Sequence, residues 1–374
     1  MPTEIRELHT LQAFLRGNYS LANTTLQAID FSGVDINWEA LEIDNTTFLG
    51  CTLPLDAELV LRRKGAYLYF HPEDHPYRPY RKALYTWREL LDGYSVDNDE
   101  SLDYRIYRHF SHHRVHPNIN EALCQRIHDH SIDEALRDLV GFDADGMTTQ
   151  RCVGIMGGHG TPRTDPFYEK TVRTAKLLTE AGYLVVTGGG PGTMEAGNLG
   201  AYLAGRSEED TRRVLRILQR APHYTDQDYL DLAFDVIGRY PTGAESLAIP
   251  TWFYGHEPSN VFASHIAKYF SNSIREDNLL AVCLHGIVYA PGSAGTTQEI
   301  FQDAAQNHYG TFRYYSPMVF LGSERYQIRT LIYPLLRQLA HGRAYAELLH
   351  LTDEPADVLA FIEAHPPVRV ANGA

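Results

Sequence analysis

The feature that most constrains this chain is a glycine-rich turn that recurs between an apolar run and a helical pattern. MGGHGTPR (156–163) follows RCVGIM, GGGPGTMEAG (188–197) follows YLVVT, and PGSAGTTQE (291–299) follows GIVYA. One such turn is weak evidence, because glycine also serves tight packing. Three turns at successive strand ends predict a phosphate-bearing ligand lying across one edge of a sheet.

The region from Cys152 to about Leu321 alternates short apolar runs with helical patterns. The stretch 166–182, for example, places Val172, Ala175 and Leu178 on one helical face and ends at a glycine. This alternation predicts an α/β fold, a Rossmann-like parallel sheet flanked by helices, with ligands at the carboxyl ends of the strands. We expect this nucleotide-binding domain to span 149–374.

Two helical patterns interrupt the alternation at 205–245. They predict an insertion, and the sequence leaves two interpretations open. The helices are either a surface decoration or a lid or subunit contact.

Residues 1–148 are expected to form an N-terminal accessory domain of α+β type. Apolar residues recur every fifth position from Leu21 to Leu41. This period suggests a short pentapeptide-like segment at 19–53, although a solenoid normally needs at least about three repeats to be stable.

Composition excludes several classes of function. Of the 374 residues, 44% are hydrophobic and 21% are charged, as in an ordinary globular protein. The formal net charge of −14 disfavours nucleic acid as a partner. No apolar stretch approaches the roughly 20 residues of a membrane helix, and the start carries no apolar signal core. We expect no membrane partner and a cytoplasmic location. The four separate cysteines predict buried thiols.

The turn 291–299 has the composition of an anion site. Small residues let the backbone approach a ligand, and Thr296 and Thr297 provide hydroxyls and free amides at the start of a helix. Glu299 follows about one turn later. It either faces another part of the ligand or simply stabilises the helix dipole.

Five motifs in this region carry a resemblance: MGGHGTPR, GGGPGTMEAG, GHEPSN (255–260), IREDNLL (274–280) and PGSAGTTQE. In this order they resemble the motifs of the LOG family, which is often labelled lysine decarboxylase without support from the residues. They look most like its branch of bacterial nucleotide 5′-monophosphate nucleosidases. The chain departs from the family pattern at Ser293, at Glu276 and in the insertion.

The resemblance implies a hydrolase, a phosphoribohydrolase that cleaves the N-glycosidic bond of a nucleoside 5′-monophosphate to free base and ribose 5-phosphate. It implies Glu299 and Arg275 as catalytic residues. It also implies a homo-oligomer, a dimer or higher. Together with the glycine-rich loops it predicts substrate- and phosphate-binding residues at Gly157, Gly158, Gly189, Gly190, Gly192, Glu195, Asn260, Gly292, Ser293, Gly295 and Thr296.

The reaction requires no cofactor and no metal, and we expect neither. Histidines at helical i, i+4 spacing in YRHFSHHRVH (107–116) resemble metal ligands, but a solvated or partner-facing helix fits them better. The alternative to hydrolysis is a non-catalytic nucleotide-binding sensor or carrier of the same fold, because the same loops bind without cleaving.

Overall fold

The computed structural model describes residues 3–70, 75–95 and 98–370. The chain divides into two compact units, each considered separately below. The first comprises Met1–Ala83 and Val115–Ala135, and the second comprises Leu84–Arg114 and Leu136–Ala374. In the described residues, no helix is both long and apolar enough to cross a membrane. All four cysteines are buried and free.

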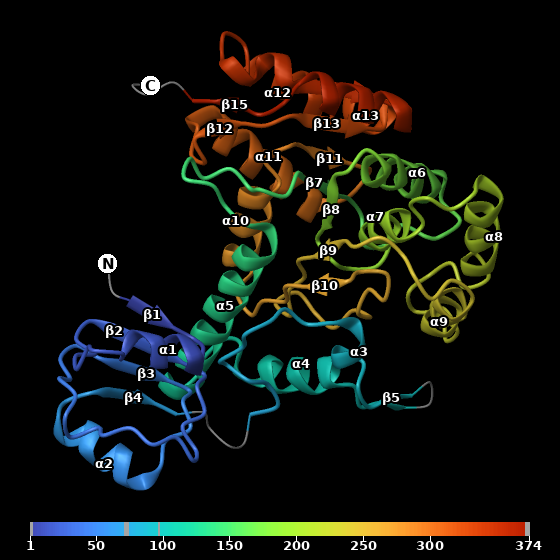
Figure 1. The fold of residues 1–374 in the computed structure, drawn as a ribbon. Coiled ribbons are helices and arrows are strands. Elements are labelled where there is room, and N and C mark those ends of the chain that lie inside the picture. The colour runs from blue at the N-terminus through green and yellow to red at the C-terminus, as the bar shows by residue number, and fades with distance from the viewer. Residues whose placement is uncertain (1–2, 71–74, 96–97, 371–374) are drawn as a thin grey trace. The chain divides into compact units, whose positions relative to one another are not determined.

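The first unit is built around a parallel four-stranded sheet in the order β1-β2-β3-β4 (Figure 1). Successive coils pair in parallel, with Thr25 opposite Thr47 and Thr47 opposite Tyr67. The residues that recur every fifth position, among them Leu21, Leu26 and Phe31, are buried in one apolar interior. The elements are β1 (Thr3–Ile5), α1 (Leu8–Phe14), β2 (Thr24–Gln27), β3 (Thr47–Leu49), α2 (Leu55–Arg63) and β4 (Tyr67–Tyr69).

The second unit contains a seven-stranded, wholly parallel sheet in the order β10-β9-β8-β7-β11-β13-β14. The predicted α/β, Rossmann-like class is therefore confirmed. The strands are β7 (Cys152–Met156), β8 (Leu184–Thr187), β9 (Leu247–Ala248), β10 (His265–Ile266), β11 (Ile287–Tyr289), β13 (Met318–Leu321) and β14 (Leu349–Thr352).

The order of these strands creates a topological switch point. The chain leaves the central strand β7 toward β8, β9 and β10, and then returns to place β11 on the other side of β7. The connections after β7 and β11 therefore diverge at the carboxyl edge of the sheet. Ligands of open α/β sheets bind in the crevice that such a divergence leaves.

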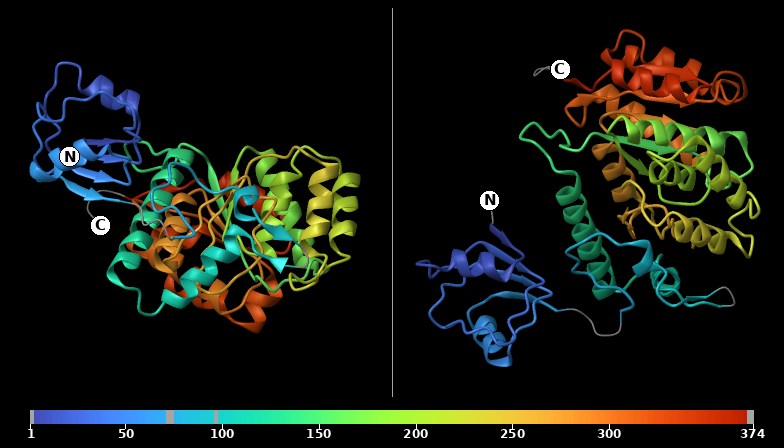
Figure 2. Two further views of the ribbon diagram at one scale, coloured as in Figure 1. Left: turned by 90° about the horizontal axis from the view of Figure 1, so that it is seen from below. Right: turned by 45° about the vertical axis from the view of Figure 1, so that its right-hand side comes forward.

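Helices α6 (Pro166–Glu180) and α7 (Thr193–Tyr202) pack side by side against the sheet (Figures 1 and 2). Local signals fix the ends of α6. The Asp165 side chain accepts a hydrogen bond from the Phe167 amide at 2.7 Å, proline occupies the first turn, and Gly182 follows at φ 83°. Alternate residues of β7, Val153 and Ile155, are buried against this layer.

Helix α13 (Pro355–Ala364) packs beside α6, and α10 (Asn272–Val282) and α11 (Ala294–Tyr309) connect the strands around β11. The remaining elements of the second unit are α3 (Trp87–Leu90), β5 (Tyr94–Ser95), β6 (Asn98–Asp99), α4 (Leu102–His113), β12 (Tyr314–Tyr315), the π-helical turn η1 (Glu324–Arg329), α12 (Ile332–Leu339), the 3₁₀ turn η2 (Ala344–Leu348) and β15 (Val368–Arg369). Helix α5 (Ile119–Val140) begins in the first unit and ends in the second.

The expected domain boundary between residues 148 and 149 differs from the division in the structure, because residues 84–114 belong to the second unit. Tyr85 forms a backbone bridge with Ile266 beside the sheet, with N–O distances of 3.0 and 2.8 Å. Asp103 of α4 binds Lys268 through both carboxylate oxygens. These contacts join residues far apart in sequence, so local composition does not predict them.

The insertion at 205–245 forms α8 (Glu208–Leu218) and α9 (Tyr229–Arg239). Their apolar faces, including Val214, Leu218 and Ala233, share one core with Val172 of α6 and Leu199 of α7. The insertion is thus packed onto the sheet domain over a continuous apolar face.

Candidate active site

A cavity of about 580 Å³ lies at the carboxyl ends of β7, β8 and β11. The three glycine-rich turns all contribute to its wall. Of the residues predicted from sequence, those that line it are Gly157, Gly158, Gly190, Arg275, Ser293, Gly295, Thr296 and Glu299. The other lining residues are Met156, His159, Gly188, Met194, Tyr224, Pro250, Thr251, Tyr254, Gly255, His256, Glu257, Ala294 and Gln298.

The amino end of α11 forms one side of this cavity. The first helical bond runs from the Thr297 amide to the Ser293 carbonyl at 3.1 Å. By helix geometry the amides of residues 294–296 therefore have no acceptor within the helix. A Cβ at Gly295 would meet open space. Free amides and the positive end of the helix dipole give this helix end the chemistry that an anion site requires.

The glycines of the other turns permit close approach between loops. Gly192 has φ 67°, and a Cβ there would lie 2.5 Å from the Gly158 carbonyl oxygen. The Thr193 amide donates to the same carbonyl at 3.0 Å. A Cβ at Gly157 would lie 2.6 Å from the Thr193 side chain. The two loops thus pack backbone to backbone and form a fixed floor.

Arg275 of α10 and Glu299 of α11 form an ion pair on the cavity wall. Arg275 Nη1 donates to Glu299 Oε1 at 3.0 Å, and the two side chains are 8% and 15% exposed. Burial raises the pKa of Glu299 above its ordinary value, and Arg275 partly opposes this shift. The pair therefore places a carboxylate with a raised pKa beside the amino end of α11.

A polar network holds Arg275 in place. Its Nη2 donates to Asn272 Oδ1 at 2.8 Å, and Asn272 Nδ2 donates to Glu276 Oε1 at 2.7 Å. Gln298 Nε2 donates to Glu276 Oε2 at 2.8 Å. Glu276, one of the departures from the pattern of the family that the chain resembles, thus links α10 to α11. Its Oε1 lies 3.6 Å from Arg275 Nη2.

Residues 251–260 form another wall, and a buried ion pair anchors them. Asp103 is fully buried, and Lys268 Nζ contacts its two oxygens at 2.7 and 2.8 Å. Trp252 Nε1 and Ser259 Oγ each donate to the same carboxylate at 2.6 Å. Burial alone would raise the pKa of Asp103, but Lys268 holds it below its usual range. One carboxylate therefore fixes both ends of the wall.

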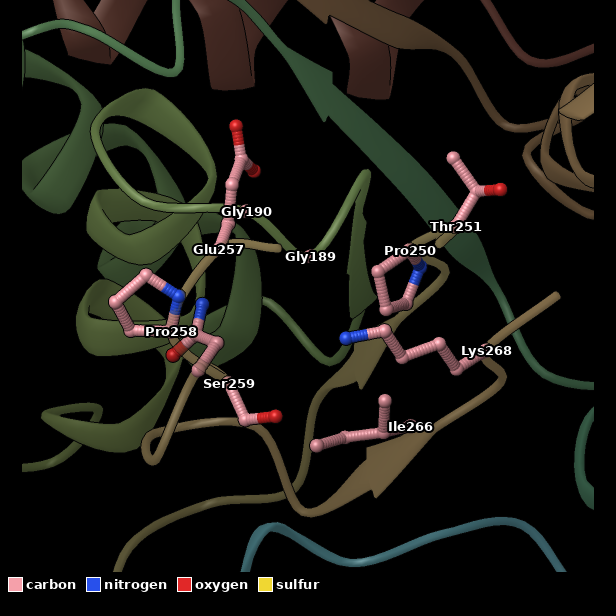
Figure 3. Close-up of a pocket in the computed structure, with 10 residues that line it drawn as sticks. Gly189, Gly190, Pro250, Thr251, Glu257, Pro258, Ser259, Ile266 and Lys268 are labelled. Atoms are coloured by element: carbon pink, nitrogen blue, oxygen red, sulfur yellow. The ribbon is translucent and has the colours of Figure 1, made fainter. Parts of the chain in front are cut away.

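Figure 3 shows the inner side of this wall, where a void of only about 10 Å³ lies between the glycine turn after β8 and residues 250–260. Gly189 lines this void and not the large cavity, and a Cβ at Gly189 would meet Pro250 at 2.7 Å. Asn260 also lies there. Its Nδ2 donates to Asn198 Oδ1 at 2.9 Å, which makes it a support for the loop.

The structure places Glu195 away from the cavity, contrary to its expected binding role. Glu195 is 4% exposed and forms a two-pronged ion pair with Arg163, at 2.9 Å from Nε and 2.5 Å from Nη2. Tyr168 donates to it at 2.7 Å. Gly192 and Gly292 do not line the cavity either, and a Cβ on Gly292 would clash with the Thr296 side chain. These residues shape the loops and do not line the cavity.

The Arg163–Glu195 pair also joins the insertion to the site. Arg163 Nη1 donates to the carbonyls of Ala221 and Tyr229 at 3.3 and 3.1 Å, and the guanidinium lies over the Tyr229 ring. Tyr224, between α8 and α9, lines the cavity, and its ring centroid lies 6.3 Å from that of His159. The insertion therefore supplies part of the cavity wall.

Sequence reasoning missed the aromatic and acidic members of the wall, namely Tyr224, Tyr254, His256 and Glu257. Within the motif GHEPSN, the resemblance predicts a binding residue only at Asn260. An acidic residue in a loop that follows a strand of a parallel sheet was the available signal for Glu257. Tyr224 had no such signal, because its position depends on how the insertion packs.

No protein-family model and no curated protein matches the chain. Among solved structures, it is similar to the molybdenum cofactor binding protein of the phototrophic bacterium Rippkaea orientalis, with TM-score 0.37 and 14% identity over 57% of this chain and 96% of that one. It is also similar to the Moco carrier protein of Chlamydomonas reinhardtii, with TM-score 0.36 and 16% identity over 57% and 96% of the two chains.

Proposed function

We propose that this chain hydrolyses the N-glycosidic bond of nucleoside 5′-monophosphates, giving the free base and ribose 5-phosphate. The observation that carries the proposal is the Arg275–Glu299 ion pair beside the free amides of α11, in one cavity. An anion site and a carboxylate one helical turn apart match a substrate whose phosphate and sugar are neighbours.

The chemistry follows from the charge that develops on the sugar. Departure of the base leaves an oxocarbenium-like sugar, which a nearby carboxylate stabilises. Glu299 Oε1 is held by Arg275, so its second oxygen serves the reaction. It accepts a proton from the attacking water, which adds to C1′ while the C1′–N bond breaks and the base leaves with the bonding electrons. The departing base takes up a proton from solvent, and Glu299 returns its own proton to solvent. Arg275 orients the carboxylate and favours its ionised form.

The phosphate is held by the amides of residues 294–296 and by the small side chains around them. Arg325 supports this loop from outside, because its Nη2 donates to the Gly292 carbonyl at 2.5 Å. Hydrogen bonds to a charged group are each worth about 1.5–3 kcal/mol. Two or three of them make the 5′-phosphate a condition for efficient cleavage.

A second candidate is a carrier or sensor that binds the nucleotide without cleaving it. The same ion pair favours this function, because a carboxylate neutralised by arginine is a weaker base than a free one. The two functions share the phosphate site and differ only in whether Glu299 acts on the sugar.

The test is to incubate the purified protein with each common nucleoside 5′-monophosphate and to measure free base by chromatography. Hydrolysis predicts release from the monophosphate, at least a hundredfold slower release from the nucleoside, and poor cleavage of the triphosphate. Tight binding of a monophosphate with no base released would favour the carrier. Equal cleavage of nucleoside and monophosphate would contradict the phosphate site.

A further inference from the structure

We propose that Glu257 recognises the ribose, accepting hydrogen bonds from its 2′- and 3′-hydroxyls, and so makes the site select ribonucleotides over 2′-deoxyribonucleotides. The inference rests on the proposed function for the identity of the ligand. It adds a specificity-determining residue to the cavity wall.

The first observation is that Gly190 makes room for this carboxylate. Glu257 lines the large cavity, and a Cβ at Gly190 would lie 2.7 Å from Glu257 Oε2. Figure 3 shows the Glu257 side chain running alongside Gly190. Gly190 does not have the positive φ that favours glycine. The missing side chain therefore matters for space, because it leaves room for the Glu257 carboxylate.

The second observation is that Glu257 has no partner of its own. Within residues 3–70, 75–95 and 98–370, its carboxylate makes no hydrogen bond and no ion pair. Lys268 is bound to Asp103. Arg275, the guanidinium on the cavity wall, is engaged by Glu299. The carboxylate therefore offers its acceptor oxygens to whatever occupies the cavity.

The loop that carries Glu257 is fixed on both sides. His256 Nε2 lies 3.0 Å from Asp99 Oδ2, and Ser259 Oγ donates to Asp103 at 2.6 Å. Rings of Tyr104 and Tyr107 pack against His256, with centroids 5.1 and 5.6 Å away. Binding therefore requires little further ordering of the loop.

The chemistry of an ionised carboxylate narrows its target. It accepts hydrogen bonds and does not donate them, so it repels a phosphate and attracts hydroxyl or amino groups. Gly190 follows β8 and the phosphate site follows β11, with β7 between them. Two strand spacings separate the loops by roughly 10 Å. Glu257 is thus set apart from the phosphate, and the two cis hydroxyls of a ribose match its two oxygens.

The test compares adenosine, inosine and 2′-deoxyadenosine 5′-monophosphates as substrates for the wild type, Glu257→Gln and Gly190→Ala. Glutamine keeps the shape of the side chain but retains one acceptor, and alanine at 190 displaces the carboxylate. Glu257→Gln should lose tenfold or more in kcat/KM on both ribonucleotides and less than threefold on the deoxynucleotide, whose 3′-hydroxyl can still use the remaining acceptor. Gly190→Ala should lose more on the ribonucleotides than on the deoxynucleotide. Glu209→Gln, on the exposed face of α8, is the matched control and should leave all three unchanged.

Calorimetric binding of ribose 5-phosphate and 2-deoxyribose 5-phosphate provides a readout that does not need turnover. The wild type should prefer the ribose compound, and Glu257→Gln should lose that preference. If no base is released but the preference holds, the proposed hydrolysis fails and this inference stands. Three results would each overturn the inference. They are an equal loss of kcat/KM on ribo- and deoxynucleotides in Glu257→Gln, a loss on the adenine nucleotides but not on inosine 5′-monophosphate, or no preference of the wild type between the two sugar phosphates.

Discussion

Arg275 Nη1 lies 3.0 Å from Glu299 Oε1, so the helices on either side of β11 are joined by an ion pair on the cavity wall. Because Arg275 belongs to α10, the ion pair makes the charge of Glu299 depend on where α10 lies. It also holds the pKa of Glu299 below the value that burial alone would give.

The first prediction concerns the acid limb of the pH profile. Burial raises the pKa of Glu299 and Arg275 lowers it, with the net result above the ordinary value. Because the ionised form is the active one, kcat/KM should rise with pH through an apparent pKa above that of a free glutamate. In Arg275→Gln the residual activity should show this limb at higher pH. A limb that stays in place or moves to lower pH would count against the assigned pairing.

The second prediction concerns Glu195. In Glu195→Gln, Arg163 is left buried without its counter-charge, which typically costs about 3–5 kcal/mol of unfolding free energy. Denaturant unfolding should show this loss, whereas nucleotide affinity of the folded fraction should change less than threefold. A large loss of affinity with unchanged stability would restore Glu195 as a binding residue.

The third prediction concerns the buried Asp103–Lys268 pair. Asp103→Leu leaves Lys268 unpaired and frees Trp252 and Ser259, so it should destabilise the protein by about 3–5 kcal/mol. The double variant Asp103→Leu with Lys268→Met removes both charges and should be less destabilised than the single one. If the double variant loses at least as much stability as Asp103→Leu and Lys268→Met alone lose together, the two charges do not interact.

The fourth prediction is a dependence of stability on Asp303. Burial raises the pKa of Asp303 from 3.8 to about 7, and Tyr289 donates to it at 2.8 Å. Between pH 3.8 and about 7 the folded state keeps a proton on Asp303 that the unfolded state has lost. Its stabilising contribution is thus complete below pH 3.8 and lost as the pH rises through 7, by at most about 1.4 kcal/mol per pH unit.

Asp303→Asn cannot titrate, and urea unfolding at pH 5, 6.5 and 8 should show a flatter dependence than in the wild type. Asp277→Asn, an exposed change on α10, should retain the wild-type slope. Parallel pH dependence of wild type and Asp303→Asn would mean that the folded state ionises Asp303 freely.

The parts of this site that the sequence predicts are those built from adjacent residues. The three glycine-rich turns lie at one sheet edge because each follows a parallel strand, and this follows from local pattern alone. Glu299 and Arg275 are also found together on the cavity wall, as the resemblance implied.

The parts that the sequence does not predict depend on partners far along the chain. Glu195, like Glu299, lies near the start of the helix that follows a glycine-rich turn, yet its ion pair with Arg163 holds it inside the protein. Asp103 lies in a segment with the composition of a separate domain, and only the fold brings it to Lys268. Spacing identifies a carboxylate near a strand end, whereas burial and its counter-charge decide what it does.

Base release by Glu299→Gln tests the central claim most directly. The variant should bind the nucleoside 5′-monophosphate with an affinity close to that of the wild type, because the phosphate contacts remain. Single-turnover release of free base should be slower by on the order of 10²-fold or more. Release at the wild-type rate from the folded, nucleotide-bound variant would contradict the account.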